Sequence, residues 1–334
     1  MKKEREIWVD YIKVIACFFV VIGHFVQSMV KSEILPRNDI YIWFNTTIYY
    51  FHVPLFFICS GYLYQRNSKI SSKKQWIDNI RKKALMLGIP YFVFSLLTWI
   101  IKKIFSDSVN EQIGGIIDTL FVHPTSPYWY LYILFFIFIF TPTINEKKRM
   151  WVVVGAAIIS KVLYIVFNDE IYRIYLIYEL FNNEIWFVIG MLMGTYGTIV
   201  IKKRQLAIVL GVFFVLLSIL VYSNENDWIS WGMGALACSA IVMFVNGCKE
   251  IKILGFFSKY TMPIFLMHTL FAASFRSILF KIGVDNTFVH IILGIIISFM
   301  GPIIGVVILK AIRLDFIVYP ERLIRKNDKR EGIK

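Results

Sequence analysis

The chain has 334 residues, is 58% hydrophobic and 17% aromatic, and carries a formal net charge of +14. Its mean hydropathy of +0.65 excludes a soluble globular protein and predicts a polytopic membrane protein. The apolar runs are about 20 residues long and do not alternate with period two, so we expect transmembrane helices and exclude a β-barrel.

Ten transmembrane helices are expected in chain order, and the predicted fold class is an all-α helical bundle that forms one membrane domain over residues 1–334. The first helix is predicted to be retained, because it is too long and too aromatic for a signal peptide and no small-residue cleavage site follows it. The expected spans are 8–30, 41–64, 85–105, 128–145, 150–168, 174–196, 206–222, 228–247, 258–280 and 288–311.

The positive charge follows the expected topology and does not indicate a nucleic-acid partner. With the N-terminus placed in the cytoplasm, 27 of the 36 Lys and Arg residues fall in inner regions and seven in outer ones. Positive residues accumulate on the cytoplasmic side of membrane proteins, so both termini are predicted to be cytoplasmic. The basic regions are expected to contact anionic lipid. They include a tail over 312–334 with a short interfacial helix over 321–325.

The first span contains two ionisable residues on one face. Lys13 and His24 are eleven residues apart, which is nearly three helical turns, so their side chains project from the same face about 16 Å apart along the axis. Ionisable residues inside a membrane are costly and indicate function. Asp10 lies three residues before Lys13. Lys13 is therefore either an interfacial residue paired with Asp10 or a fixed cation for an anionic ligand.

Two further histidines, His52 and His268, are expected near mid-depth of other spans. A neutral imidazole suits a general base, although a membrane histidine also serves in helix packing. Pro54 is expected to kink the second span, and Ser60 and Gly61 permit close helix approach. No metal site is expected, because no carboxylate or second histidine lies at the supporting helical spacing. The four cysteines are expected to be core residues.

Several loop and interface residues are weaker candidates. The outer loop over 106–127 is a candidate lid or acceptor-side loop. The basic inner segment over 73–83 is expected to lie along the membrane surface. Glu179 and Glu184 in the sixth span are candidates to bind a sugar or to pair with Arg276. Trp129 belongs either to an interfacial aromatic belt or to a sugar-stacking site.

The order of these motifs is informative. An Asp10-x-x-Lys13-x10-His24 first helix precedes a Pro-Leu-Phe-Phe-x-x-Ser-Gly-Tyr second helix, and Ile-Pro-Tyr over 89–91 leads into the third span. Tyr-Trp-Tyr-Leu over 128–131 and a Ser-x4-Pro-Ile-Phe-Leu-x-His segment over 258–268 follow. Over nearly the whole chain this pattern resembles the acyltransferase 3 family of integral membrane acyltransferases.

The resemblance implies transfer of an acyl group, usually acetyl, from cytoplasmic acetyl-CoA to a hydroxyl of an extracytoplasmic sugar or cell-surface polysaccharide. Acetyl-CoA is expected as a cosubstrate, with no permanently bound cofactor. The family's essential basic residue and histidine correspond to Lys13 and His24. We predict that His24 is the general base with Lys13 and Asp10 in the catalytic group. We predict that Lys13, Arg81, Lys82 and Lys83 hold the donor phosphates and that the substrate or oxyanion contacts come from His52, Ser60, Trp129, Glu184 and His268.

This chain departs from the family pattern at three points. Lys13 stands where the family usually has Arg, and Lys lacks the bidentate fork that suits phosphate. Arg81 remains of the paired arginines usual before the third span, and Tyr128 replaces a usual histidine.

Two other functions remain open at this stage. A transporter or exporter of a sugar, a lipid-linked saccharide or an amino acid could use the same intramembrane polar residues. The protein could also be a structural partner of a polysaccharide synthase. An acyltransferase needs a cytoplasmic cation site connected to His24, whereas a pure transporter does not. The expected location is a bacterial plasma membrane.

Overall fold

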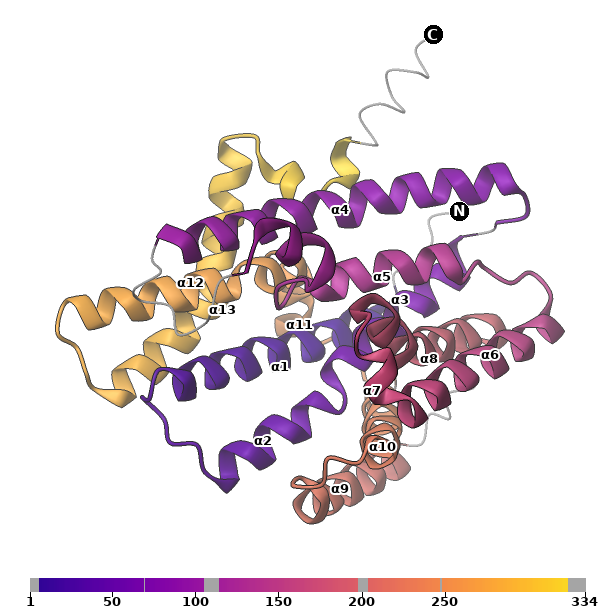
Figure 1. Ribbon diagram of the computed structural model, residues 1–334, viewed down its shortest axis with the longest axis horizontal. Coiled ribbons are helices and arrows are strands. Elements are labelled where there is room, and N and C mark those ends of the chain that lie inside the picture. The colour runs from indigo at the N-terminus through magenta and orange to yellow at the C-terminus, as the bar shows by residue number, and fades with distance from the viewer. Residues whose placement is uncertain (1–5, 69, 105–113, 198–203, 247, 324–334) are drawn as a thin grey trace, which may run out of the picture.

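The structure is a computed structural model, and it describes residues 6–68, 70–104, 114–197, 204–246 and 248–323. These residues form helices and no strand, which confirms the predicted all-α class (Figure 1). The elements are α1(Ile7–Lys31), α2(Asp39–Tyr49), α3(His52–Asn67), α4(Lys73–Ile104), η2(Asp118–Val122), α5(Trp129–Phe140), α6(Lys147–Val166), α7(Asn168–Ile171), α8(Tyr175–Tyr196), α9(Arg204–Val221), α10(Asp227–Asn246), α11(Lys252–Phe257), α12(Thr261–Lys281), α13(Thr287–Ala311) and η3(Asp315–Ile317).

In this described part of the chain, nine helical segments are long and apolar enough to cross a membrane, with α2 and α3 counted together. The tenth expected span is α5, which has only 12 residues. A helix of that length extends about 18 Å, well short of the roughly 30 Å hydrocarbon core. The ten spans expected from the sequence therefore correspond to nine long segments and one short apolar helix.

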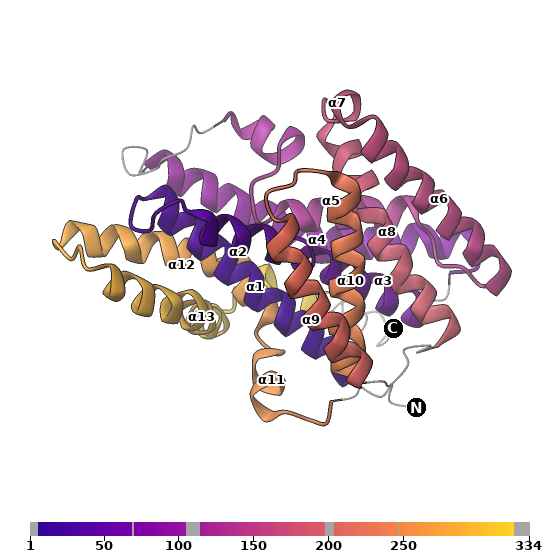
Figure 2. The ribbon, with the colours of Figure 1, turned by 90° about the horizontal axis from the view of Figure 1, so that it is seen from below.

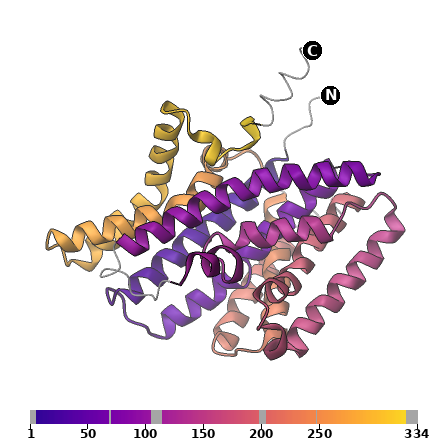
Figure 3. The same ribbon diagram turned by 45° about the horizontal axis from the view of Figure 1, so that its top comes forward.

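Helix α1 runs through the middle of the bundle and carries most of the predicted site. It packs against α3, α10, α11, α12 and α13. Figure 1 shows α12 and α13 on one side of α1 and α6 and α8 on the other. Figure 2 shows α9 and α10 lying across α1 and α3. In Figure 3 the purple α4 runs along the bundle for most of its length. Residues of α1 are therefore reached from several surrounding helices.

The closest helix crossing joins α3 to α8. A Cβ atom added at Gly61 would lie 1.9 Å from the carbonyl oxygen of Phe187, and one added at Gly190 would lie 2.0 Å from that of Ile58. Lipid tails are as apolar as leucine, so close packing of this kind holds membrane helices together. The crossing confirms the prediction that Gly61 permits close helix approach.

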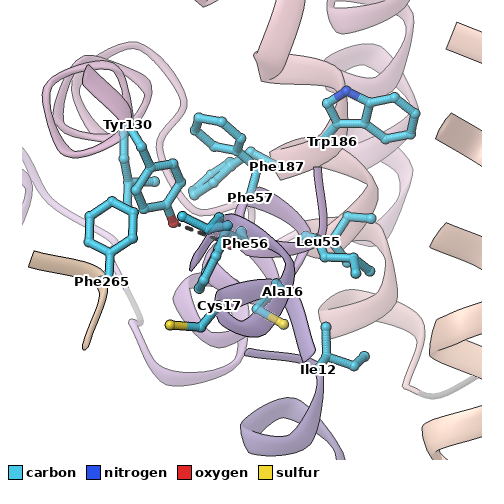
Figure 4. Packing of buried hydrophobic residues seen from close by; sticks show 14 of the residues in the cluster. Ile12, Ala16, Cys17, Leu55, Phe56, Phe57, Tyr130, Trp186, Phe187 and Phe265 are labelled. Carbon is cyan, nitrogen blue, oxygen red and sulfur yellow. Dashed lines mark hydrogen bonds between the residues drawn. The ribbon is translucent and has the colours of Figure 1, made fainter. Parts of the chain in front are cut away.

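An aromatic cluster of buried residues joins α3, α5 and α12 (Figure 4). The Tyr130 ring meets Phe57 at 4.8 Å, Phe56 at 5.6 Å and Phe265 at 5.8 Å between ring centroids. Its hydroxyl donates to the Phe56 carbonyl oxygen at 3.3 Å. Such tilted and edge-to-face contacts are favourable for aromatic pairs. The cluster fixes the position of α12, and thus of His268, relative to α3.

Of the four cysteines, all free, Cys17, Cys59 and Cys238 are buried as expected.

The expected second span is divided in two at residues 50 and 51. Helix α2 ends at Tyr49 and α3 begins at His52. Pro54 lies in the first turn of α3, where its missing N–H costs no helical hydrogen bond. The prediction of a kink at Pro54 is therefore wrong in its position, because the interruption precedes the proline.

Helix α4 is continuous over 32 residues, so the surface helix expected over 73–83 is not a separate element. This basic segment is the N-terminal extension of the third span. In the outer loop, Asp118–Val122 forms a short π-helix, while Asp107 and Glu111 lie outside the described residues. Of the interfacial helix expected over 321–325, residues 321–323 are helical and the remainder also lies outside the described residues.

Candidate active site

A cavity of about 490 Å³ lies beside the C-terminal half of α1. Its walls come from α1, α4, α12, α13 and the loop before α5. His24 and Ser28 lie one helical turn apart on the wall that α1 provides. We call this space the histidine cavity, because both His24 and His268 line it.

His24 is held between α12 and the loop before α5. Its ring centroid lies 5.5 Å from that of His268, and its Nε2 atom lies 3.4 Å from the Ser126 hydroxyl. The loop that contributes Ser126 is the predicted acceptor-side loop. The structure therefore places part of that loop at the histidine, and its role as a lid stays a prediction.

The hydrogen bonds of His268 determine which of its ring nitrogens is the acceptor. Nδ1 lies 3.0 Å from the Ile264 carbonyl oxygen and 2.9 Å from that of Phe265. Carbonyl oxygens only accept, so Nδ1 carries the hydrogen and a neutral ring has its lone pair on Nε2. Nε2 is buried and has no hydrogen-bond partner. His268 therefore carries a buried acceptor nitrogen that has no hydrogen-bond partner among the described residues.

His52 completes a group of three histidines drawn from three spans. It is buried, and its charge would reach His24. Its Nδ1 atom donates to the Ile48 carbonyl oxygen at 2.6 Å, across the break between α2 and α3. His52 therefore stabilises this break as well as lying near His24. Among the residues that the structure describes, no three His, Cys, Asp or Glu side chains are grouped so as to hold a metal ion.

Lys13 lies toward the opposite end of α1 with a second group of cations. Its charge reaches Lys83 on α4 and Cys59 on α3. The Lys83 Nζ atom lies 4.0 Å from the Phe138 ring centroid and 5.7 Å from that of Tyr64. Favourable cation–π contacts of this kind fix the position of a lysine head. Lys13 and Lys83 are thus two cations whose charges interact.

Three neighbours of this pair differ in their placement. Lys82 is exposed, and its charge also reaches Lys83. Arg81 is exposed and lies 3.9 Å from Asp78. Asp10 is half-buried, one turn before Lys13, and its charge reaches Cys59. Of the four predicted donor-site cations, Lys13 and Lys83 are therefore half-buried with interacting charges, whereas Lys82 and Arg81 are exposed.

Four of the five predicted substrate or oxyanion residues, namely His52, Ser60, Trp129 and Glu184, are not among the described residues that line the histidine cavity. The Ser60 hydroxyl lies 3.0 Å from that of Tyr130, in the aromatic cluster. Glu184 accepts a hydrogen bond from Thr141 at 2.9 Å. Trp129 packs on the edge of the core at the start of α5.

The alternative pairing of a glutamate with Arg276 is not formed. Glu179 accepts a hydrogen bond from the Asn183 side chain at 2.9 Å, and Arg276 donates to the Ser28 hydroxyl. Arg276 thus connects α12 to α1 one turn beyond His24.

The sequence analysis did not identify three residues, Arg276, Ser28 and Ser126, as residues that line the histidine cavity. Arg276 was visible as a cation in an outer span end, eight residues after His268. Ser28 follows His24 at the i+4 position and shares its face. Ser126 carried no signal, because its contact with His24 joins residues that are 102 positions apart.

These features define a polytopic helical membrane protein. The histidine cavity lies toward one end of its central helix α1, and the half-buried cations Lys13 and Lys83 lie toward the other end. Residues 6–307 match the family described as "Acyltransferase domain". The chain belongs to this family, the acyltransferase 3 family, which confirms the resemblance seen in the sequence.

Two curated relatives are nodulation proteins NolL from bacteria. The protein from Mesorhizobium japonicum is 27% identical over 162 residues, which cover 46% of this chain and 40% of the relative. The protein from Sinorhizobium fredii is 26% identical over 160 residues, which cover 46% of this chain and 41% of the relative. The match thus spans about two fifths of the length of these relatives. No solved structure matches the chain.

Proposed function

We propose that this protein is a membrane O-acyltransferase that moves an acyl group, acetyl in the simplest case, from cytoplasmic acyl-CoA to a hydroxyl of an extracytoplasmic sugar or cell-surface polysaccharide. Membership of the acyltransferase 3 family supports the reaction class. The observation that carries the proposal is the two-ended arrangement of α1. His24 lines the histidine cavity, and Lys13, whose charge interacts with that of Lys83, lies toward the other end.

The cation pair suits the donor. Acyl-CoA is polyanionic, and its phosphates need fixed positive charges. Lys13 and Lys83 supply two charges that already repel each other, so an anionic ligand relieves that repulsion. Lys13 and His24 are about 16 Å apart along the axis of α1 by helical rise. The donor's flexible arm would bridge this distance and bring its thioester to His24.

The chemical step uses His24 as the base. Its imidazole removes the proton from the acceptor hydroxyl while that oxygen attacks the thioester carbonyl carbon. A carbon–oxygen bond forms, the carbon–sulfur bond breaks, and the departing thiolate takes the proton back from the imidazolium. General base catalysis of this type contributes about 10²- to 10⁴-fold to a rate.

His268 supports this step as a hydrogen-bond acceptor. With Nδ1–H committed to two carbonyls, its neutral ring keeps the buried Nε2 as an acceptor close to the His24 ring. An acceptor hydroxyl that displaces the groups covering Nε2 would donate to it and be oriented toward His24. A role as oxyanion donor would instead require the doubly protonated ring.

The test uses the full-length protein in lipid nanodiscs with radiolabelled acetyl-CoA and a glycan fraction from the bacterial cell envelope. Label transfer to glycan is expected for the wild type and for Arg149→Gln, which alters an exposed arginine paired with Glu146 that is not among the described cavity residues. Transfer should be lost in His24→Ala. The proposal is wrong if acetyl-CoA does not bind, or if transfer survives in His24→Ala. A transporter would move saccharide without consuming acetyl-CoA.

A further inference from the structure

A second cavity, of about 350 Å³, lies between α1 and the helices α11, α12 and α13. Its described lining residues are aliphatic or aromatic except for Cys17 and Thr261. Sites for small ligands typically have volumes of about 300–1,000 Å³, and this lining suits a hydrocarbon chain. We call this space the apolar groove.

The apolar groove opens on the outside of the bundle, away from the predicted catalytic face of α1. Phe18 and Ile253 line it and are 46% and 63% exposed. At about 100° per residue, Phe18 lies roughly 120° around the helix from His24 and roughly 140° from Lys13. The apolar groove is therefore separate from the face that is proposed to carry the acyl donor and the base.

Hydrogen bonds fix the helices that form the apolar groove. The Tyr11 hydroxyl donates to the Ile251 carbonyl oxygen at 3.2 Å and accepts from the backbone N–H of the same residue. The Cys17 thiol donates to the Thr261 carbonyl oxygen at 3.6 Å. These bonds hold α11 and the start of α12 against α1. The apolar groove is thus a defined feature of the helix packing.

Exposed cations border the apolar groove. The segment 249–260 contains three lysines and one glutamate, and all four are exposed. Lys252 directly precedes the lining residue Ile253, and Lys259 lies two residues before the lining residue Thr261. Among the ion pairs of the described residues, none involves Lys252 or Lys259. Positive charge beside an apolar groove is complementary to a lipid with a negative headgroup and a hydrocarbon chain.

Helix α11 has the character of an interfacial helix. It lies at the edge of the bundle (Figure 2), and its residues Ile253 and Phe256 are 63% and 44% exposed beside the exposed Lys252. Apolar and basic side chains on one such helix are typical of the boundary between lipid headgroups and acyl chains. This position brings the lysines to the depth of a lipid phosphate.

We propose that the apolar groove binds one acyl chain of an anionic phospholipid, with Lys252 and Lys259 holding its phosphate. The bound lipid would join α11, α12 and α13 to the half of α1 that carries Lys13. This site is separate from the histidine cavity, and the inference does not depend on acyl transfer.

The test is photochemical labelling of the full chain in phosphatidylcholine nanodiscs. Trace amounts of phosphatidylglycerol or phosphatidylcholine are added, each with a diazirine on an acyl chain, and mass spectrometry measures the label in residues 14–19 and 253–264. The phosphatidylglycerol probe should label these segments at least about fivefold more, the effect of one lysine near an anionic headgroup. Equal labelling by the two probes, or no label in either segment, would overturn the proposal.

A double variant tests the headgroup contact. Lys252→Gln with Lys259→Gln should reduce labelling by the phosphatidylglycerol probe to the level of the phosphatidylcholine probe. Lys148→Gln is the matched control, because Lys148 is an exposed lysine on α6, a helix that contributes no described residue to the apolar groove. Undiminished labelling in the double variant would contradict the role of the two lysines.

A third variant tests entry of the chain. Ile253→Trp places a larger ring at the mouth of the apolar groove and should lower the labelling of residues 14–19 by both probes, measured per folded molecule. Unchanged labelling there would show that the chain stays outside and would overturn the proposal. Excess acetyl-CoA should have no effect, whereas displacement of the probe by acetyl-CoA would assign the apolar groove to the acyl donor instead of a lipid.

Discussion

His24 on α1 and His268 on α12 face each other with their ring centroids 5.5 Å apart and their planes inclined by 36°. Two imidazolium ions at this distance repel each other, so at most one ring of the pair is positively charged during a reaction. The hydrogen bonds of His268 leave its acceptor nitrogen unused. The pair is thus arranged to take one proton from a ligand.

Variants of His268 separate its backbone contacts from its free acceptor. In His268→Asn the amide nitrogen can replace Nδ1 at the Ile264 and Phe265 carbonyls, whereas nothing replaces Nε2. We expect a folded protein whose kcat is lower by about tenfold or more, the scale of one lost hydrogen bond to a reacting group. The KM for acetyl-CoA should stay constant.

His268→Gln is the companion variant, because its side-chain oxygen can occupy the region of Nε2. It should recover part of the kcat lost in His268→Asn. Steady-state kinetics of transfer, together with thermal unfolding of both variants, make the comparison. A wild-type kcat for His268→Asn would mean that the ring serves only to pack α12.

Lys83 and Lys82 are adjacent cations with different environments, and they provide a matched test of the donor site. Lys83 lies over the Phe138 ring and near Lys13, whereas Lys82 is exposed. Lys83→Gln should raise the KM for acetyl-CoA about tenfold, since a positioned charge meeting a phosphate contributes roughly 1.5–3 kcal/mol. Lys82→Gln should change KM about threefold or less, because exposed charges are screened.

The KM values are to be measured at low and at physiological ionic strength. Added salt should reduce the effect of Lys82→Gln more than that of Lys83→Gln. Equal effects of the two substitutions at both salt concentrations would argue against a fixed donor site at Lys83.

Most helices were predictable because the bilayer sets the length of each apolar run. The first span was expected over 8–30 and is Ile7–Lys31. The break at residues 50 and 51 was not predicted, because its stabilisation depends on the bond from His52 to Ile48. The continuity of α4 past its basic segment was also missed, since charge pattern does not distinguish a surface helix from an extended span.

The site was only partly predictable for a related reason. Spacing along one helix placed Lys13 and His24 on one face, but the meeting of His24 with His268 depends on how α1 packs against α12. Likewise, Ser60 shares a helix with His52, yet its hydroxyl contacts Tyr130. Contacts between helices follow from side-chain packing across the bundle, which a single sequence does not display.

The α3–α8 crossing gives a stability prediction with an internal control. Gly61→Ala places a methyl group 1.9 Å from a backbone carbonyl that cannot move independently. Overpacking of this type costs about 1–3 kcal/mol or more. We expect a lower melting temperature and a lower yield of folded protein. Gly211→Ala lies in open space on α9, and there alanine should be neutral or slightly stabilising. Equal melting temperatures for the two variants would contradict the crossing geometry.

The buried Lys161 on α6 had no role in the sequence-based predictions, and its contacts indicate a structural one. It is 4% exposed, and its Nζ atom donates to the Asn182 side-chain oxygen at 2.5 Å and lies 4.4 Å from the Tyr164 ring centroid. Lys161→Met keeps most of the volume but leaves Asn182 without its donor. The free energy of unfolding should fall by about 1–3 kcal/mol.

Acyl transfer per folded molecule should be unchanged in Lys161→Met, because Lys161 is not among the described residues that line the histidine cavity. The double variant Lys161→Met with Asn182→Leu removes both partners, and it should regain part of the stability because the Asn182 side-chain oxygen is then no longer left without its donor. Thermal unfolding in nanodiscs and transfer activity normalised to folded protein test both points. A Lys161→Met protein that is fully stable but inactive would instead place Lys161 in the reaction.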